Sequence, residues 1–339
     1  MNTLHRHLGK HSAEIIDSLK QEKYSDTRMP GLLTHRYKAD TSTATLDVDP
    51  SLAGLNIIIT GNRVRVSPGV LDHPAITFTD ELSNRTCNPR AGYTPDVAAS
   101  LSYLLCGNLL QLNVTGYVDR VIYITYLSDF ETLNTTVLDV NVNDTAQVDI
   151  VETVTSYSLY SVMANYHVGG TAKLRLHTFY SNSVAGSSIL ARQVYLSDRA
   201  TFTHGLLGAG SNVLVDETRL YPGFRSNSRI VGVTSTRAAQ FRSVLTVHPE
   251  IEEYAVTVDY RNVLTMDSNV GYYAGVAGDS VSKRSYVNAT ELTIDKVDPD
   301  AAAVCVAEFV KDVMAEINID GRQDTAEFSR KKSEYKLIY

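Results

Sequence analysis

Apolar and polar residues alternate with a period of two along most of this chain. Val64 and Val66, for example, alternate with Arg63 and Arg65. This period sends successive side chains to opposite faces of a β-strand. It therefore predicts strands from residue 46 onward, most clearly at 118–126, 137–142, 147–154, 173–180 and 201–207, with a turn at Pro68-Gly69.

Two segments follow a helical period instead. Residues 11–24 place Ile15, Ile16 and Leu19 on one face, and residues 95–105 end before Gly107, a typical helix stop. We expect both to be short helices near the N-terminal end of the strand-rich region, where they could cover its open end.

A short unit recurs through the middle of the chain. A polar turn leads to a small residue and then to an alternating strand, and Ala146, Ala172 and Ala200 in these units are 26 and 28 residues apart. A weaker echo lies near Ile230, 30 residues further on. Repeats at this spacing favour a β-solenoid, because each coil is too thin to bury its apolar face without stacked neighbours. A Greek-key sandwich or a jelly roll also has short strands and turns and is the alternative.

The stretch from Ala146 to Ile294 resembles the β-helix core of the SufB/SufD family of iron–sulfur cluster scaffolds. The resemblance depends on the strands Val148–Glu152 and Val213–Arg219 and on the segment Arg261–Asp267, which is similar to a family segment of the type R-N-L-L-L-S-D. It implies a right-handed parallel β-helix over residues 46–321. An N-terminal helix and arm (1–45) would precede this domain, and a C-terminal tail (322–339) would follow it.

The chain departs from that family where the family's function lies. Members carry a cysteine–histidine segment soon after the last strand, but residues 295–302 contain neither. Cys305 follows closely, within the apolar run 301–307, where we interpret it as a small buried hydrophobe. Residues 301–339 also leave little room for the helical domain with which the family docks its ATPase. We therefore expect no metal site and no cofactor.

Composition and charge exclude several other classes. The net charge is −7, and the basic residues cluster only at Arg330-Lys331-Lys332, so we expect no nucleic-acid partner. Cys87, Cys106 and Cys305 form no CxxC pair, which argues against a cysteine-rich zinc site. The apolar runs are too short to cross a bilayer, so we expect no membrane contact.

The polar residues give no convincing catalytic group. His7 and His11 are four residues apart, but in a cationic terminal segment. His177, His204 and His248 could align in one row of a solenoid, where a stacked polar ladder is the expected role. The candidate carboxylates of a carbohydrate-cleaving enzyme are Asp198, Glu217 and Asp259, but nothing in their spacing pairs them. Asn143 and Asp144 are candidate calcium ligands, but both residue types suit a turn at least as well.

We therefore expect a non-enzymatic structural component of a large assembly, in the first place a structural protein of a tailed-phage virion. Its partners would be copies of itself or other subunits, with no small-molecule substrate. The alternative is a divergent SufD-like subunit of an iron–sulfur assembly complex, which would lie in the cytoplasm.

Overall fold

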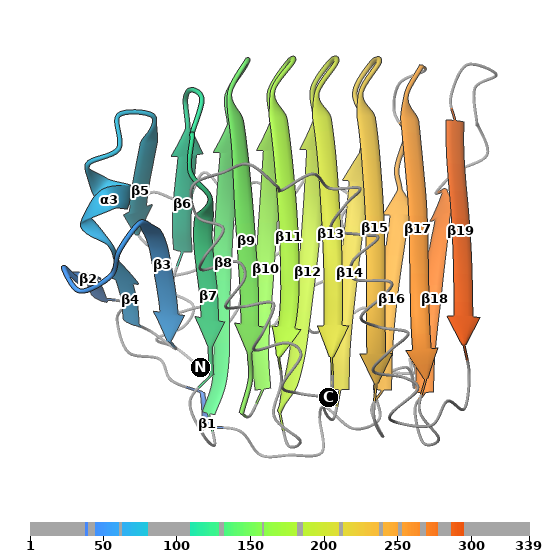
Figure 1. The fold of residues 1–339 in the computed structure, drawn as a ribbon, viewed down its shortest axis with the longest axis horizontal. Helices are drawn as coiled ribbons and strands as arrows, with labels where there is room; N and C mark the ends of the chain where they lie inside the picture. The colour runs from blue at the N-terminus through green and yellow to red at the C-terminus, as the bar shows by residue number, and fades with distance from the viewer. Residues whose placement is uncertain are drawn as a thin grey trace, which may run out of the picture.

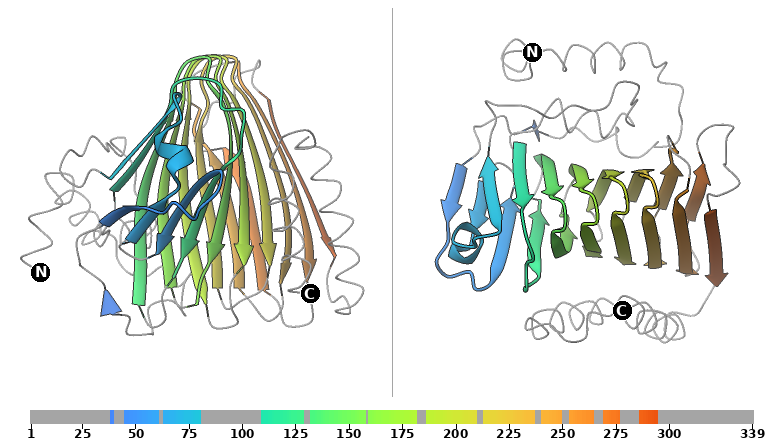
Figure 2. Two further views of the ribbon diagram at one scale, coloured as in Figure 1. Left: turned by 60° about the vertical axis from the view of Figure 1, so that its left-hand side comes forward. Right: turned by 90° about the horizontal axis from the view of Figure 1, so that it is seen from above.

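The fold is a parallel β-solenoid in which the chain passes alternately between two facing sheets (Figures 1 and 2). The computed structural model describes residues 38–39, 45–60, 63–80, 109–128, 132–157, 159–181, 186–209, 213–236, 240–249, 253–264, 269–276 and 286–294. The solenoid prediction is thus confirmed. Right-handed winding stays a prediction, and the expected helices at 11–24 and 95–105 lie outside the described residues.

From β6 onward, each sheet takes every second strand of the chain. Sheet I has the order β18 (Asn269–Val276), β16 (Gln240–Val247), β14 (Val213–Tyr221), β12 (Ser187–Leu196), β10 (Leu159–Val168), β8 (Thr132–Val142), β6 (Leu109–Val114), β5 (Ile76–Asp80), and β1 (Lys38–Ala39) pairs with β8. Sheet II has the order β19 (Tyr286–Ile294), β17 (Ala255–Leu264), β15 (Asn227–Thr236), β13 (Thr201–Ala209), β11 (Lys173–Ser181), β9 (Gln147–Thr155), β7 (Ile122–Leu127), β3 (Leu55–Thr60), β4 (Arg63–Val66), β2 (Thr45–Val48).

Strand direction changes only near the N-terminal end of the described solenoid. Strand β5 runs antiparallel to β6, and β3 runs antiparallel to β4, whereas the pairs from β6 to β19 are parallel. The expected turn at Pro68-Gly69 is a single helical turn, α3 (Pro68–Leu71), because Pro68 suits a first helical position. The strand expected at 118–126 begins only at Ile122.

Tight turns connect sheet I to sheet II in the four coils from β8 to β15. In each of these four turns, the amide of the fourth residue donates to the carbonyl of the first, at 3.0 to 3.2 Å. The third residue has a positive φ of 55 to 67°. The turns are Asn143-Asp144-Thr145-Ala146, Gly169-Gly170-Thr171-Ala172, Ser197-Asp198-Arg199-Ala200 and Gly223-Phe224-Arg225-Ser226. In the unit after that of Ala200, Ser226 therefore occupies the position of the small residue. The weaker repeat predicted near Ile230 was placed four residues too far along the chain.

Successive turns are bonded to one another. The amide of the third residue donates to a carbonyl of the next turn, as from Thr145 to Gly170 (3.2 Å) and from Arg199 to Phe224 (2.8 Å). The carboxylate of Asp144 also accepts from the amide of Gly170, at 2.6 Å. These bonds hold the turns in line, so that equivalent residues of neighbouring coils lie side by side.

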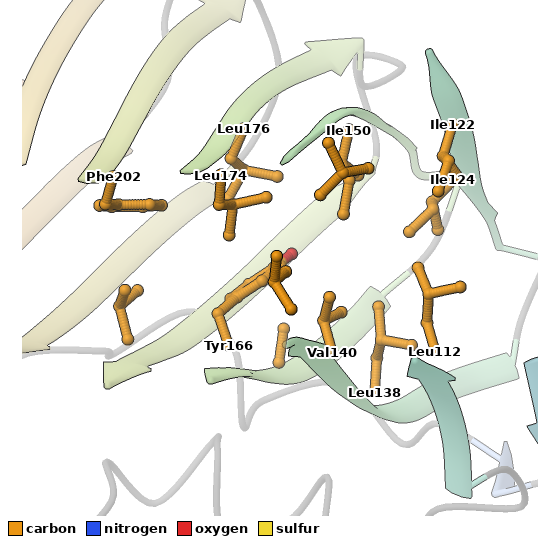
Figure 3. Close-up of a cluster of buried hydrophobic side chains, with 14 of the residues drawn as sticks. Leu112, Ile122, Ile124, Leu138, Val140, Ile150, Tyr166, Leu174, Leu176 and Phe202 are labelled. Atoms are coloured by element: carbon orange, nitrogen blue, oxygen red, sulfur yellow. The ribbon is translucent and has the colours of Figure 1, made fainter. Parts of the chain in front are cut away.

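The core fills the space between the two sheets. Inward residues repeat down each sheet in register, as in the row Val140, Tyr166, Val194 and Leu220 of sheet I. Most are fully buried. Figure 3 shows side chains from the two sheets facing each other, among them Leu112, Leu138, Val140 and Tyr166 from sheet I and Ile122, Ile124, Ile150, Leu174, Leu176 and Phe202 from sheet II.

Candidate functional site

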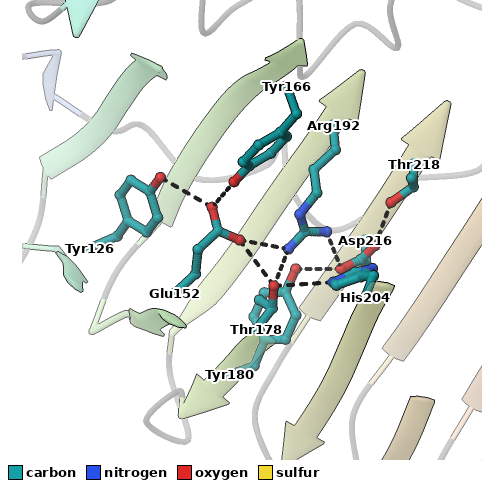
Figure 4. Close-up of polar contacts among 9 residues, drawn as sticks. All are labelled: Tyr126, Glu152, Tyr166, Thr178, Tyr180, Arg192, His204, Asp216 and Thr218. Carbon is teal, nitrogen blue, oxygen red and sulfur yellow. Dashed lines mark hydrogen bonds and ion pairs between the residues drawn. The ribbon is translucent and has the colours of Figure 1, made fainter. Parts of the chain in front are cut away.

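A cluster of charged and hydroxyl side chains interrupts the apolar core. Arg192 on β12 is fully buried and lies between two carboxylates, Glu152 on β9 and Asp216 on β14 (Figure 4). Its Nη2 is 3.1 Å from Glu152 Oε2, and its Nη1 is 2.7 Å from Asp216 Oδ2. Ala164 and Thr218 are its neighbours in register, and their small side chains leave room for the guanidinium.

Tyrosines from three strands donate to the two carboxylates. Tyr166 Oη donates to Glu152 Oε1, and Tyr126 Oη reaches the same oxygen at 3.4 Å. Tyr180 Oη donates to Asp216 Oδ2 at 2.7 Å. Burial raises the pKa of each of these tyrosines well above the ordinary value, and the nearby carboxylates raise it further. The phenols therefore keep their protons and remain donors.

Thr178 connects the ions to a buried histidine. Its hydroxyl donates to Glu152 Oε2 (3.0 Å) and accepts from Arg192 Nη2 (2.7 Å), while His204 Nε2 lies 3.2 Å away. These partners assign the His204 proton to Nε2. Burial lowers the pKa of His204 well below its usual value, and the charge of Arg192 lowers it further, so the imidazole is neutral.

The arrangement binds its own coils together and presents no chemistry to a substrate. Glu152, Arg192 and Asp216 are at most 2% exposed, and the described bonds join the carboxylates to donors of the core. Burial alone would lower the pKa of Arg192, but Asp216, Tyr180 and Glu152 hold it above its ordinary value. A general acid or base must reach its substrate, and these groups are enclosed.

The three histidines singled out in the sequence do not share a row, so that prediction is wrong. His177 lies on the outer face of β11, His204 points inward from β13, and His248 follows β16 on sheet I. Although the strand assignments were nearly right, the face of each strand depends on its exact register, and a shift of one residue reverses it.

A stacked ladder does exist, built from other residues. The rings of His167, Tyr195, Tyr221 and His248 stack on the outer face of sheet I with centroids 4.8, 4.6 and 5.0 Å apart. These spacings match the separation of neighbouring strands, about 4.8 Å. The rings recur at intervals of 28, 26 and 27 residues, so the sequence itself carries a signal for this ladder.

The candidate carboxylates are not brought together. Asp198 lies in a tight turn and accepts from the amide of Phe224 (3.3 Å). Glu217 on β14 accepts from Arg219 Nε (2.9 Å), and Asp259 lies on β17, in the other sheet, paired with Arg261. Within the described ranges, no group of three or more histidine, cysteine, aspartate or glutamate side chains could hold a metal ion. The cysteines, the segment 295–302, His7, His11 and the Arg330–Lys332 run lie outside those ranges.

A surface groove of about 580 Å³ lies beside the ring ladder, where the sheet I strands enter their turns. It crosses the ends of successive coils, from Thr115 past the ends of β8 and β10 to that of β12. Its lining residues are Thr115, Asn141, Val142, Asn143, Asp144, His167, Val168, Gly169, Tyr195 and Ser197. Unlike the buried cluster, this groove is open to solutes.

No protein-family model matches the chain, and no curated protein matches it either. In the part of the chain that the structure describes, none of the helices has the length and apolar character needed to span a bilayer. The SufB/SufD resemblance thus remains a prediction from short segments, and the solenoid is established by the coordinates alone.

Proposed function

We propose that this chain is a non-catalytic structural component of a larger assembly. One observation carries the proposal. Three buried charged groups, Glu152, Arg192 and Asp216, pair with one another inside the core, where they join several coils of the solenoid. Groups buried in this way restrict the coils to one register and give a rigid body, which is what an assembly subunit needs.

The last strands of the two sheets support a role in assembly. Among the described residues, β18 pairs only with β16 and β19 only with β17, so one edge of each has no described strand beside it. Edges of eight and nine residues present backbone donors and acceptors that must be covered. The cover is either the chain's own remaining segments or a neighbouring subunit.

The first candidate among assemblies is a tailed-phage virion. The reasons come from the sequence. The chain resembles a β-helix scaffold but lacks the cysteine–histidine segment on which scaffold chemistry depends, and only 20% of its residues are charged. A low charge content suits permanent contacts between subunits better than free diffusion at high concentration.

Measurement of the molar mass in solution tests the assembly. We expect multi-angle light scattering of the full chain to give a multiple of 37.3 kDa that persists on dilution. A monomer at every concentration, with no partner recovered from the producing cells, would overturn the proposal. Mass spectrometry of purified virus particles tests the virion, where this chain should be present in many copies.

The alternative, a SufD-like subunit of a cluster-assembly complex, makes a different prediction. Such a subunit purified without oxygen should contain iron and sulfide or should bring an ATPase with it. We expect neither. Stoichiometric iron in the anaerobic protein would reject the structural role in favour of this alternative.

A further inference from the structure

The groove on sheet I lies where the ring ladder ends. Asn141 occupies the row of the ring ladder next to His167, and its side chain is much shorter than the rings that follow. Gly169 also lines the groove, and a Cβ atom there would lie 2.5 Å from Asp144 Oδ1, so this position admits no side chain. The short side chain of Asn141 is therefore the sequence feature that ends the ladder beside the groove.

The lining presents hydrogen-bonding groups that are still available. The carboxylate of Asp144 uses Oδ1 for the amide of Gly170 (2.6 Å), and Asn141 donates its amide to Asn113 (2.8 Å). Among the described residues, Asp144 Oδ2 and Asn141 Oδ1 have no donor. The hydroxyl of Ser197 lies in the same lining, and so does that of Thr115, which donates to the carbonyl of Ala75 (3.5 Å).

The same lining indicates what kind of molecule fits. A carboxylate and amide oxygens beside aromatic rings suit a ligand with several hydroxyl donors and an otherwise uncharged surface. The lining contains no lysine or arginine, and Asp144 would repel a phosphate or sulfate. The volume of about 580 Å³ is in the range of small-molecule sites.

We infer that this groove binds a neutral saccharide. Binding occurs without cleavage, because glycoside hydrolysis requires two carboxyl groups across the scissile bond and Asp144 is the one carboxylate in the lining. The groove crosses consecutive coils, so the ligand lies along the solenoid axis beside His167 and Tyr195. This binding site is independent of the assembly proposed above: a monomeric chain that binds saccharides would reject the assembly and leave the groove's assignment intact.

A glycan array tests the assignment. The probes are neutral oligosaccharides, with sialylated and sulfated glycans on the same array, and the best binder is then titrated by calorimetry. We expect the full chain to bind at least one neutral oligosaccharide. Asn141→Tyr places a ring in the groove and extends the ladder, and it should weaken binding at least about tenfold, as truncation or filling of a central contact does.

Asn113→Tyr is the matched control. It lies in the same row one coil earlier, outside the groove, and both substitutions remove the same bond between Asn113 and Asn141. Its binding should equal that of the unmodified chain. Should Asn141→Tyr fail to fold, Asp144→Asn keeps an oxygen for the amide of Gly170 and should also weaken binding. The inference is rejected by the absence of neutral binders, by equal binding to both tyrosine variants, or by binding of the acidic glycans alone.

Discussion

At the scale of the residue, the unusual feature is a fully buried arginine with two buried carboxylates. Such a group is not in itself a source of stability, because desolvation offsets much of the attraction between the charges. Removing one partner is another matter, since it leaves the remaining charges buried without compensation. Removing Arg192 should therefore cost much more free energy of unfolding than the complete ion cluster contributes.

Arg192→Met should destabilise the protein by about 3–5 kcal/mol, because Glu152 and Asp216 would then be buried without a cation. The free energy of unfolding in urea measures this. Arg65→Met is the control, since Arg65 is half exposed in its pair with Asp49 and should contribute less than about 1 kcal/mol. Equal losses for the two variants would mean that the buried cluster has no special role.

The buried histidines predict sensitivity to acid. Burial, with a smaller contribution from the charge of Arg175, lowers the pKa of His177 from 6.5 to about 3. Between pH 6.5 and pH 3, the histidine is therefore protonated in the unfolded chain and neutral in the folded chain. The contribution of this group to stability is complete above pH 6.5 and is lost as the pH falls toward 3. From pH 7 to pH 5 the loss from one such histidine is about 2 kcal/mol.

His177→Gln should remove that part of the acid sensitivity. The measurement is the free energy of unfolding of both proteins at pH 7 and pH 5, and the variant should have the smaller difference. His204 still contributes its own loss in both proteins, because its pKa is lowered in the same direction. An unchanged difference would show that His177 is already accessible to protons in the folded state.

At the scale of the element, the tight turn is the recurring unit. Its third residue has a positive φ although none of the four residues found there in the complete turns is a glycine: Thr145, Thr171, Arg199 and Arg225. A left-handed conformation costs a residue with a side chain about 1–2 kcal/mol, and a β-branched threonine is among the least suited to it. The neighbouring turns hold it in place through their backbone bonds.

Thr171→Gly should therefore raise the free energy of unfolding by about 1 kcal/mol, because glycine adopts φ 58° without a steric penalty. Gly169→Ala, two residues earlier in the same turn, should lower it, since the added Cβ meets the backbone of Asn143 and Asp144 at 2.7 to 2.9 Å. Thermal and urea unfolding of both variants measure the pair. If the free energy of unfolding changed in the same direction in both variants, this explanation of the turn would be wrong.

The elements that could be predicted from the sequence are those that depend on residues close together in the chain. The strands after Ala146, Ala172 and Ala200 were predicted within two residues at either end, because alternation and turn composition are local signals. The next turn was missed because serine replaces alanine at Ser226. The cluster around Arg192 could not be predicted, since it joins residues 24 and 40 positions apart through the register of several coils.

At the scale of the whole molecule, the strands of each described coil pair with those of the coils before and after it. From β6 to β19 both sheets extend by parallel pairing of neighbouring strands, so the stability of a solenoid is close to a sum over neighbouring coils. The ion cluster is an exception, because Glu152, Arg192 and Asp216 belong to β9, β12 and β14 and connect coils beyond the nearest pair. The coils from β9 to β14 should thus open as one unit.

Hydrogen exchange measured by mass spectrometry tests this unit. In the unmodified chain, we expect amides from β9 to β14 to be protected alike and more strongly than those of β2 to β5, where the strands are short. Arg192→Met should lower protection throughout β9 to β14 and leave β3 and β4 near their original level, since those strands share no bond with the cluster. A uniform loss along the whole chain would instead mean that the solenoid unfolds in one cooperative step, and the cluster would then stabilise the molecule as a whole and not a particular set of coils.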